Sequence, residues 1–347
     1  MNKIARMDPA RRIELFSETA NRLDIPEFLI EKDFWVCWVL KQLFSIEKFS
    51  GRLLFKGGTT LSKVFGIINR FSEDIDLAVD YTMLGFTGPR DPLRQNLSKS
   101  KRAALLLEML RECQRYIGTE FLTSLIARCS EILGETGWDL SIDAHDPNTV
   151  RFQYPEGVQQ RVAYVAPQVV LELGTHAEFI PRDNFVIRSF AAREFPGSFG
   201  EPDVPVTALL AKRTFWEKAT ILHAEYHRAA EKPIPGRYSR HYYDLTMLAK
   251  SHVKDEALGD IELLSRVVKH KQAFYPSAWA HYALAVPGSL RLVPPPNRVS
   301  ALKADYRSMA VMIFGHPPGF EDVLEELAKL EREVNAPSGV PAPLLLR

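Results

Sequence analysis

Residues 52–79 hold two short strand-like stretches separated by a glycine pair and a helical segment, and this order constrains the fold more than any other feature. Arg52–Phe55 is a short apolar run that leads into Gly57-Gly58, as expected of a strand followed by a turn. Apolar residues recur on one helical face of Thr60–Ile68, and in Asp74–Val79 they alternate with carboxylates. A mixed α/β unit is therefore predicted here.

The same run carries residue types that suit a nucleotide triphosphate. Gly57-Gly58 would let the backbone approach phosphates closely, and the amides that open the following helix suit negative charge. Asp74 and Asp76 lie at positions i and i+2 of the predicted strand, so both carboxylates project from one face and can hold Mg²⁺. A glycine pair or an Asp-x-Asp alone is a weak signal, but their combination predicts a catalytic nucleotide site.

The remaining pattern divides the chain into a mixed first part and a helical second part. Residues 8–48 and Arg102–Leu133 read as helices, and a Pro/Gly-rich break covers Phe195–Pro205. From Val206 the pattern is helical, interrupted at Pro287–Pro296. The further strands are expected at Arg151–Tyr154, Arg161–Val165, Val169–Leu173 and Phe185–Ser189. We therefore expect an α+β chain with a mixed-sheet catalytic domain over 1–200, a helical domain over 201–335 that contributes to the active site, and a mobile tail over 336–347.

Composition excludes several classes of protein. The chain has 347 residues and a net charge of +1, and its 46% hydrophobic and 25% charged content is ordinary for globular proteins. We read no membrane span and no signal peptide. The three cysteines fit neither a disulfide framework nor a zinc site, and with no signal peptide they favour a cytoplasmic protein.

The motifs resemble a known family. Lys56–Phe65 (KGGTTLSKVF) and Arg70–Leu77 (RFSEDIDL) resemble the first motif of polymerase-β-like nucleotidyltransferases, and more narrowly the AbiEii/AbiGii toxins of bacterial abortive-infection and toxin–antitoxin systems. Glu31–Phe34, Arg213–Lys218 and Arg240–Leu245 also agree with that family. The resemblance implies an NTP-using, Mg²⁺- or Mn²⁺-dependent nucleotidyltransferase toxin of phage defence, with a cognate antitoxin.

The resemblance also implies roles for residues outside the first motif. Lys218 and Asp244 match the family's active-site lysine and aspartate best, with Lys212 as the rival lysine. Lys218 would place a positive charge on the triphosphate, and Asp244 would position that lysine or act as a base on the acceptor hydroxyl. The alternative is an ordinary interhelix salt bridge. Glu172 is the candidate for a third metal carboxylate, or else an outward-facing edge residue. The superfamily usually has Gly-Ser where this chain has Gly57-Gly58. This chain therefore lacks the serine hydroxyl of that motif, which Thr59 or Ser72 could replace. The residues expected to contact the nucleotide are Lys56, Gly57, Gly58, Thr59, Arg70, Ser72 and Lys218.

Local charge favours a polyanionic acceptor. Residues 90–115 and 207–241 each carry seven Lys or Arg against three Asp or Glu, although such runs are often just solvated faces. With the family resemblance, this predicts transfer of NMP to RNA, with the tRNA 3′ end as the expected acceptor. The alternatives are a protein of this fold that binds NTP or RNA without turnover, and an enzyme that nucleotidylates a protein or small molecule. His223 and His227 are interpreted as surface histidines rather than zinc ligands.

Overall fold

The computed structural model describes residues 1–72, 74–155, 157, 167–310 and 312–336, and the chain divides into two compact units. The first comprises Met1–Phe65 and Phe71–Leu209 and is called the sheet unit. The second, the helical unit, comprises Gly66–Arg70 and the chain from Leu210 onward. The predicted strand Arg161–Val165 and the predicted mobile tail, apart from Ala336, lie outside the described residues.

The sheet unit is built on one seven-stranded mixed sheet, with strand order β3-β4-β5-β2-β1-β7-β6. The β2–β5 and β1–β7 pairs are parallel, and the other neighbouring pairs are antiparallel. The strands are β1 (Leu53–Lys56), β2 (Asp74–Val79), β3 (Asp139–Ile142), β4 (Thr149–Gln153), β5 (Val169–Gly174), β6 (Arg182–Ile187) and β7 (Val204–Leu209).

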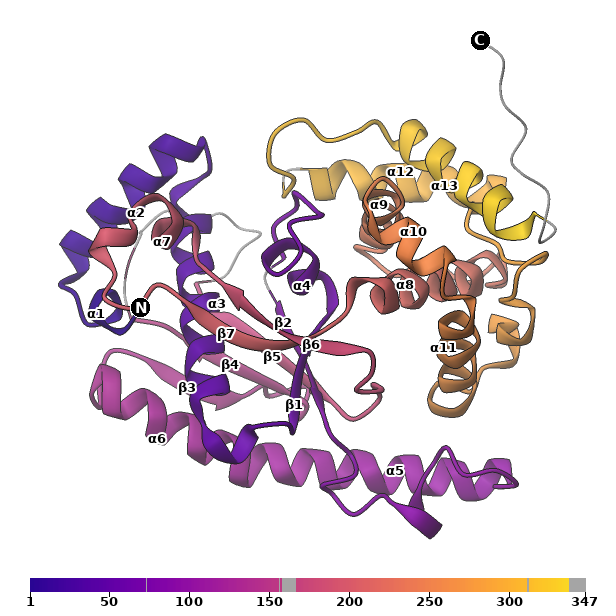
Figure 1. Ribbon diagram of the computed structural model, residues 1–347, viewed down its shortest axis with the longest axis horizontal. Coiled ribbons are helices and arrows are strands. Elements are labelled where there is room, and N and C mark those ends of the chain that lie inside the picture. The colour runs from indigo at the N-terminus through magenta and orange to yellow at the C-terminus, as the bar shows by residue number, and fades with distance from the viewer. Residues whose placement is uncertain (73, 156, 158–166, 311, 337–347) are drawn as a thin grey trace. The chain divides into compact units, whose positions relative to one another are not determined.

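Seven α-helices belong to the described part of the sheet unit, and α3 lies across the sheet (Figure 1). Its Phe34, Trp35 and Trp38 join one apolar core with Ile75 and Leu77 of β2. Because strand side chains alternate, this burial turns Asp74 and Asp76 to the opposite face. The helices are α1 (Asn2–Ala5), α2 (Pro9–Leu23), α3 (Glu27–Ser45), α4 (Gly57–Lys63), α5 (Lys99–Tyr116), α6 (Leu122–Leu133) and α7 (Phe190–Glu194), with a π-helical turn at Ile117–Phe121 between α5 and α6.

In the helical unit, α9 packs against both α8 and α13. The segment Gly66–Arg70 joins this unit through an isolated bridge between Arg70 and Ile313 and a 2.7 Å hydrogen bond from the Phe314 amide to the Asn69 carbonyl. The helices are α8 (Ala211–Tyr226), α9 (Ser239–Ala249), α10 (Val253–Leu258), α11 (Ile261–Phe274), α12 (Pro296–Ala310) and α13 (Phe320–Asn335). None of the helices in the described ranges is both long and apolar enough to cross a membrane.

The structure corrects the predicted secondary structure at three places. Val206–Leu209 belongs to β7 and not to a helix, because Val204, Val206 and Ala208 alternate into the sheet core. β3 was not expected at all. The first helical region is two helices separated by Asp24 in the left-handed conformation (φ 53°). The sheet unit accordingly runs through Leu209, whereas the sequence placed the boundary near residue 200.

Candidate active site

A row of polar side chains crosses four neighbouring strands on the face of the sheet opposite the main core. Lys56 of β1 is in register with Asp76 of β2, Asp76 with Glu172 of β5, and Glu172 with Thr149 of β4. Paired strands lie about 4.8 Å apart, so the in-register residues Asp76 of β2 and Glu172 of β5 lie side by side. Asp74 precedes Asp76 on the same face.

Glu172 does not lie on an edge strand, since β5 is flanked by β2 and β4. Its side chain is nevertheless exposed, while its neighbours Leu171 and Leu173 are buried in the core. An acidic side chain on the open face of an interior strand, in register with Asp76, is well placed to join a cation site. Its role as a metal ligand stays a prediction.

Asp74, Asp76 and Glu172 supply carboxylate oxygens, which are the ligands that Mg²⁺ prefers. No cluster of three or more His, Cys, Asp or Glu is preformed for a metal within the described ranges. Mg²⁺ is commonly held by only one or two carboxylates together with water and substrate phosphates. The donor set of this face therefore fits Mg²⁺ bound along with a nucleotide.

Gly57 makes room for the Asp76 carboxylate. Its φ of +81° is a conformation that L side chains rarely adopt, and a Cβ added there would lie 2.0 Å from Asp76 Oδ2. Lys56 Nζ lies 3.8 Å from Asp76 Oδ1. The turn between β1 and α4 is thus built around the Asp76 carboxylate, which explains why this position is glycine.

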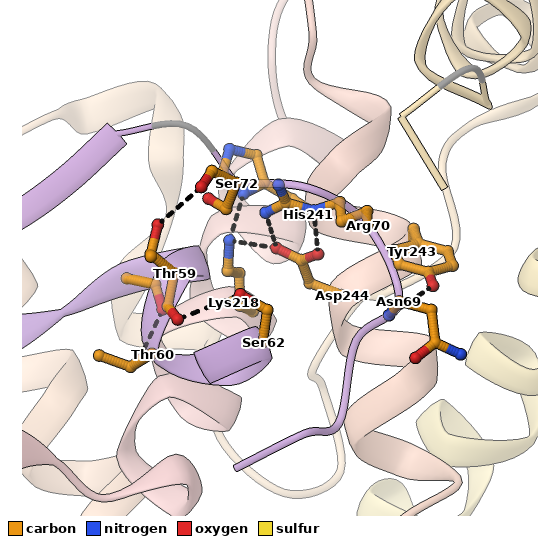
Figure 2. Close-up of polar contacts among 11 residues, drawn as sticks. Thr59, Thr60, Ser62, Asn69, Arg70, Ser72, Lys218, His241, Tyr243 and Asp244 are labelled. Atoms are coloured by element: carbon orange, nitrogen blue, oxygen red, sulfur yellow. Dashed lines mark hydrogen bonds and ion pairs between the residues drawn. The ribbon is translucent and has the colours of Figure 1, made fainter. Parts of the chain in front are cut away.

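Thr59 ties the start of α4 to the start of β2 (Figure 2). Its hydroxyl donates a 2.5 Å hydrogen bond to the Asp74 carbonyl and lies 3.5 Å from the Ser72 carbonyl, and its side chain is buried. Thr60 donates in the same way to the Gly57 carbonyl at 2.7 Å. Because its hydroxyl proton is engaged by the backbone, Thr59 holds the Gly57–Thr60 turn against the strand that carries both aspartates.

Within the helical unit, the Asp244 carboxylate of α9 forms ion pairs with two basic side chains, Arg70 and Lys218 (Figure 2). Arg70 donates from Nε to Oδ1 at 2.7 Å and from Nη2 to Oδ2 at 2.8 Å, and Lys218 Nζ lies 2.8 Å from Oδ2. All three side chains are buried. Burial by itself raises the pKa of Asp244, but the charges and hydrogen bonds of Arg70 and Lys218 outweigh it and lower that pKa well below its usual value.

The Asp244 carboxylate thus faces two cationic side chains, Arg70 and Lys218. Lys212, the rival lysine, instead pairs with Asp260 at 2.7 Å and is partly exposed. An interhelix ion pair between α8 and α9 is therefore real, but it is buried and doubly cationic, unlike an ordinary surface salt bridge. Burial beside Asp244 distinguishes Lys218 from the partly exposed Lys212, and the choice of Lys218 as the partner of a phosphate stays a prediction.

Sequence reasoning missed two residues that shape this cluster. His241 lies one turn before Asp244, and its Nδ1 is 3.0 Å from Lys218 Nζ. Asp305 of α12 caps α9 by accepting from the amides of Arg237 and Ser239 at 2.6 and 2.8 Å. An (i, i+3) spacing from Asp244 was the available signal for His241. No sequence signal points to Asp305, which is distant along the chain.

Several basic side chains of the runs 90–115 and 207–241 form ion pairs or hydrogen bonds within the protein. Arg90 pairs with Glu108 at 2.8 Å, and Arg102 donates to the Pro92 carbonyl at 2.9 Å. The side chains of this run that are exposed near the start of α5 include Arg94, Lys99 and Lys101. In the second run, the ion-paired residues include Lys212, Lys218 and Arg228.

The interpretation of His223 as a surface residue is wrong. Its side chain is fully buried, and its Nδ1 accepts a 3.1 Å hydrogen bond from the Arg291 amide while Nε2 lies 3.2 Å from the His281 carbonyl. Both ring nitrogens thus contact the backbone, as in a structural histidine.

Comparison with known proteins gives a matching family model and similar solved structures. The family described as Nucleotidyl transferase AbiEii toxin, Type IV TA system matches residues 38–326, which is most of the chain. Among solved structures the chain is similar to MenT4, a nucleotidyltransferase toxin from Mycobacterium tuberculosis. The identity is 18%, the TM-score is 0.43, and the match covers 92% of this chain and 96% of that one. No curated protein sequence matches the chain.

Proposed function

Because the chain belongs to the AbiEii nucleotidyltransferase toxin family of type IV toxin–antitoxin systems, we propose that it transfers NMP from an Mg²⁺-bound NTP to RNA, with the tRNA 3′ end as acceptor. The observation that carries this proposal is the row formed by Lys56, Asp76 and Glu172 on an open sheet face, next to a glycine that fits around the Asp76 carboxylate. Mn²⁺ has the same preference for oxygen ligands and is the alternative cation.

In the proposed reaction, Asp74 and Asp76 hold the metal, with Glu172 as a third ligand, and Thr59 keeps their strand fixed against the glycine turn. When bound, the metal would neutralise charge on the phosphates. An RNA hydroxyl attacks the α-phosphorus of the NTP, the new P–O bond forms, and the bond to the β-phosphate breaks, so that pyrophosphate leaves. Lys56, the backbone of Gly57-Gly58 and Ser72 contact the triphosphate. Lys218 neutralises it, and Asp244, which also accepts from Arg70, holds the Lys218 ammonium in place.

The acceptor is proposed to be RNA because three basic side chains in or just before the first turn of α5 are exposed: Arg94, Lys99 and Lys101. Lysine and arginine side chains of this kind neutralise backbone phosphates, and such binding weakens steeply as salt rises. Recognition then depends on the shape and single-stranded end of the RNA rather than on a duplex sequence. The proposal includes a cognate antitoxin that relieves the toxicity.

The test is incubation of the purified protein with Mg²⁺, each labelled NTP and total tRNA, followed by measurement of RNA mass. Wild-type protein should lengthen tRNA, and the Asp74→Ala and Asp76→Ala variants should lose at least ~10³-fold in rate because the metal site is removed. Asp183→Ala is the matched control, since Asp183 is an exposed carboxylate on β6 of the same sheet. Lys218→Met should be inactive, and Lys212→Met should remain active.

The other outcomes select among the alternatives. Unchanged tRNA together with a labelled protein or small molecule would replace the RNA acceptor by that substrate class. Tight binding of NTP with no labelled product of any kind would identify a protein that binds without turnover. Full activity of correctly folded Asp74→Ala and Asp76→Ala variants would remove these carboxylates from the site.

A further inference from the structure

The Lys218 amino group lies between two acceptors that come from one turn of α9. Asp244 Oδ2 is 2.8 Å from Nζ, and His241 Nδ1 is 3.0 Å from the same atom (Figure 2). The two acceptors are three residues apart, so they project from the same side of the helix. No part of the proposed function so far uses His241.

The chemistry of the contact fixes the state of the imidazole. Burial lowers the pKa of Lys218, and the adjacent Asp244 opposes that effect. A charged lysine has three N–H donors and no acceptor, so beside charged Lys218 the Nδ1 atom accepts and the proton of the neutral ring is on Nε2. Burial first, and then the charges of Lys218 and Arg240, lower the pKa of His241 well below its usual value. The charge of Asp244 opposes this lowering of the pKa, and the charge of Arg70 adds to it. The centres of the Tyr238 and His241 rings lie 4.8 Å apart.

Two fixed acceptors matter for a lysine because its ammonium is a point charge at the end of a flexible chain. With Asp244 alone, the Nζ atom could rotate about one contact. With Asp244 and His241 together, two of the three N–H donors are committed, and the direction of the third is set. A single oriented donor is what binding a phosphate oxygen requires.

We propose that His241 is a positioning residue whose Nδ1 accepts from Lys218 and orients the remaining Lys218 N–H toward the triphosphate. This inference rests on the proposed function of Lys218. It adds that the histidine must stay neutral and must offer an acceptor at the δ position of its side chain.

A pair of amide substitutions tests the position of the acceptor. Asn places an amide oxygen on the same carbon that bears Nδ1 in histidine, whereas Gln places it one carbon further out. His241→Asn should keep NTP affinity and turnover within about threefold of wild type, and His241→Gln should lose roughly 10- to 100-fold in kcat/KM, the equivalent of one hydrogen bond to a charged group. His252→Asn, at an exposed histidine beside α10, is the control. Thermal unfolding of each variant separates loss of folding from loss of positioning.

The ¹⁵N NMR spectrum of protein labelled at histidine tests the inference independently of enzyme activity. The signal that disappears in His241→Asn belongs to His241, and we expect it to show a neutral ring protonated on Nε2 throughout pH 5–8. Titration of that signal near the usual histidine pKa of about 6.5, or a proton on Nδ1, overturns the inference. Equal kcat/KM for wild type, His241→Asn and His241→Gln also overturns it. If wild-type protein neither binds nor transfers NTP, the proposed function fails instead, and the spectrum still tests the contact.

Discussion

At the scale of single residues, Gly57 is the most constrained position of the candidate site. Its positive φ and the closeness of the Asp76 carboxylate are two separate reasons for glycine. Gly51 shares only the first reason, because it has a φ of +70° and nothing within 4 Å of an added Cβ. Comparing substitutions at Gly57 and Gly51 therefore distinguishes the effect of backbone strain from the effect of displacing Asp76.

We predict that Gly57→Ala abolishes transfer while Gly51→Ala does not. Each variant should lose about 1–2 kcal/mol of stability from the left-handed backbone, but only the Cβ at residue 57 would push Asp76 away. Urea unfolding gives the free energies, and the tRNA assay gives the activities. Equal activity in the two variants would mean that the position of Asp76 does not matter for the reaction.

At the scale of elements, an ion pair away from the sheet face fixes α4. Lys63 of α4 forms an ion pair with Asp33 of α3, which also accepts a 2.7 Å hydrogen bond from the Phe190 amide at the start of α7. Lys63 Nζ lies 3.9 Å from the centre of the Phe190 ring. Both charged side chains are buried, so three helices meet at one desolvated pair. A buried ion pair need not stabilise a protein relative to apolar residues, but removing one partner lowers the free energy of unfolding strongly.

We predict that Lys63→Met destabilises the protein by about 3–5 kcal/mol, because it leaves the Asp33 carboxylate buried without its cation. The double variant Asp33→Asn/Lys63→Met should recover most of that loss, since asparagine still accepts from the Phe190 amide and carries no charge. Urea unfolding of the two single variants and the double variant gives the coupling. Additive losses would show that the two side chains do not depend on each other.

A second prediction for an element concerns α8 and pH. Burial lowers the pKa of His223 from 6.5 to about 4, against the opposing effect of its contact with the His281 carbonyl. Between these values the unfolded chain binds the proton and the folded chain does not, so stability should fall as the pH drops from 6.5 to 4. The contribution is about 3 kcal/mol at most.

His223→Asn should remove this contribution, because the amide oxygen can still accept from the Arg291 amide but cannot be protonated in this range. The unfolding free energy of the variant should therefore fall less between pH 6.5 and pH 4 than that of wild type. His252→Asn is the comparison at an exposed site. An identical pH slope in wild type and His223→Asn would contradict the assignment.

The sequence predicted these elements unevenly, and the reasons are physical. Alternation around Ile75 and Leu77 was enough to place Asp74 and Asp76 on one face, because one buried side of a strand determines the other. β7 was missed because Val206–Leu209 is followed almost directly by α8, so its apolar residues were read as the first turns of that helix. The (i, i+3) spacing places His241 on the same side of its helix as Asp244, but its contact with Lys218 joins two helices, and spacing within one helix does not predict such a contact.

At the scale of the whole molecule, the family membership makes a prediction about living cells. Induced expression of the wild-type chain alone should stop bacterial growth, and Asp76→Ala should not, because the toxicity is proposed to come from nucleotide transfer. Growth curves, with immunoblots to show equal protein levels, make the comparison. Normal growth with an enzyme that is active in vitro would argue for a housekeeping or phage-triggered role.

The segment Gly66–Arg70 has a consequence for inheritance. It lies between α4 and β2 in the chain, yet it packs in the helical unit and supplies the guanidinium that binds Asp244. A recombination event that exchanged only the chain beyond Leu209 would bring a new partner for Arg70 without bringing Arg70 itself. The two units are therefore not interchangeable modules. Among descendants of a common ancestor, changes at Arg70 and Asp244 should be inherited as a pair, and a chimera should work only when both come from the same parent.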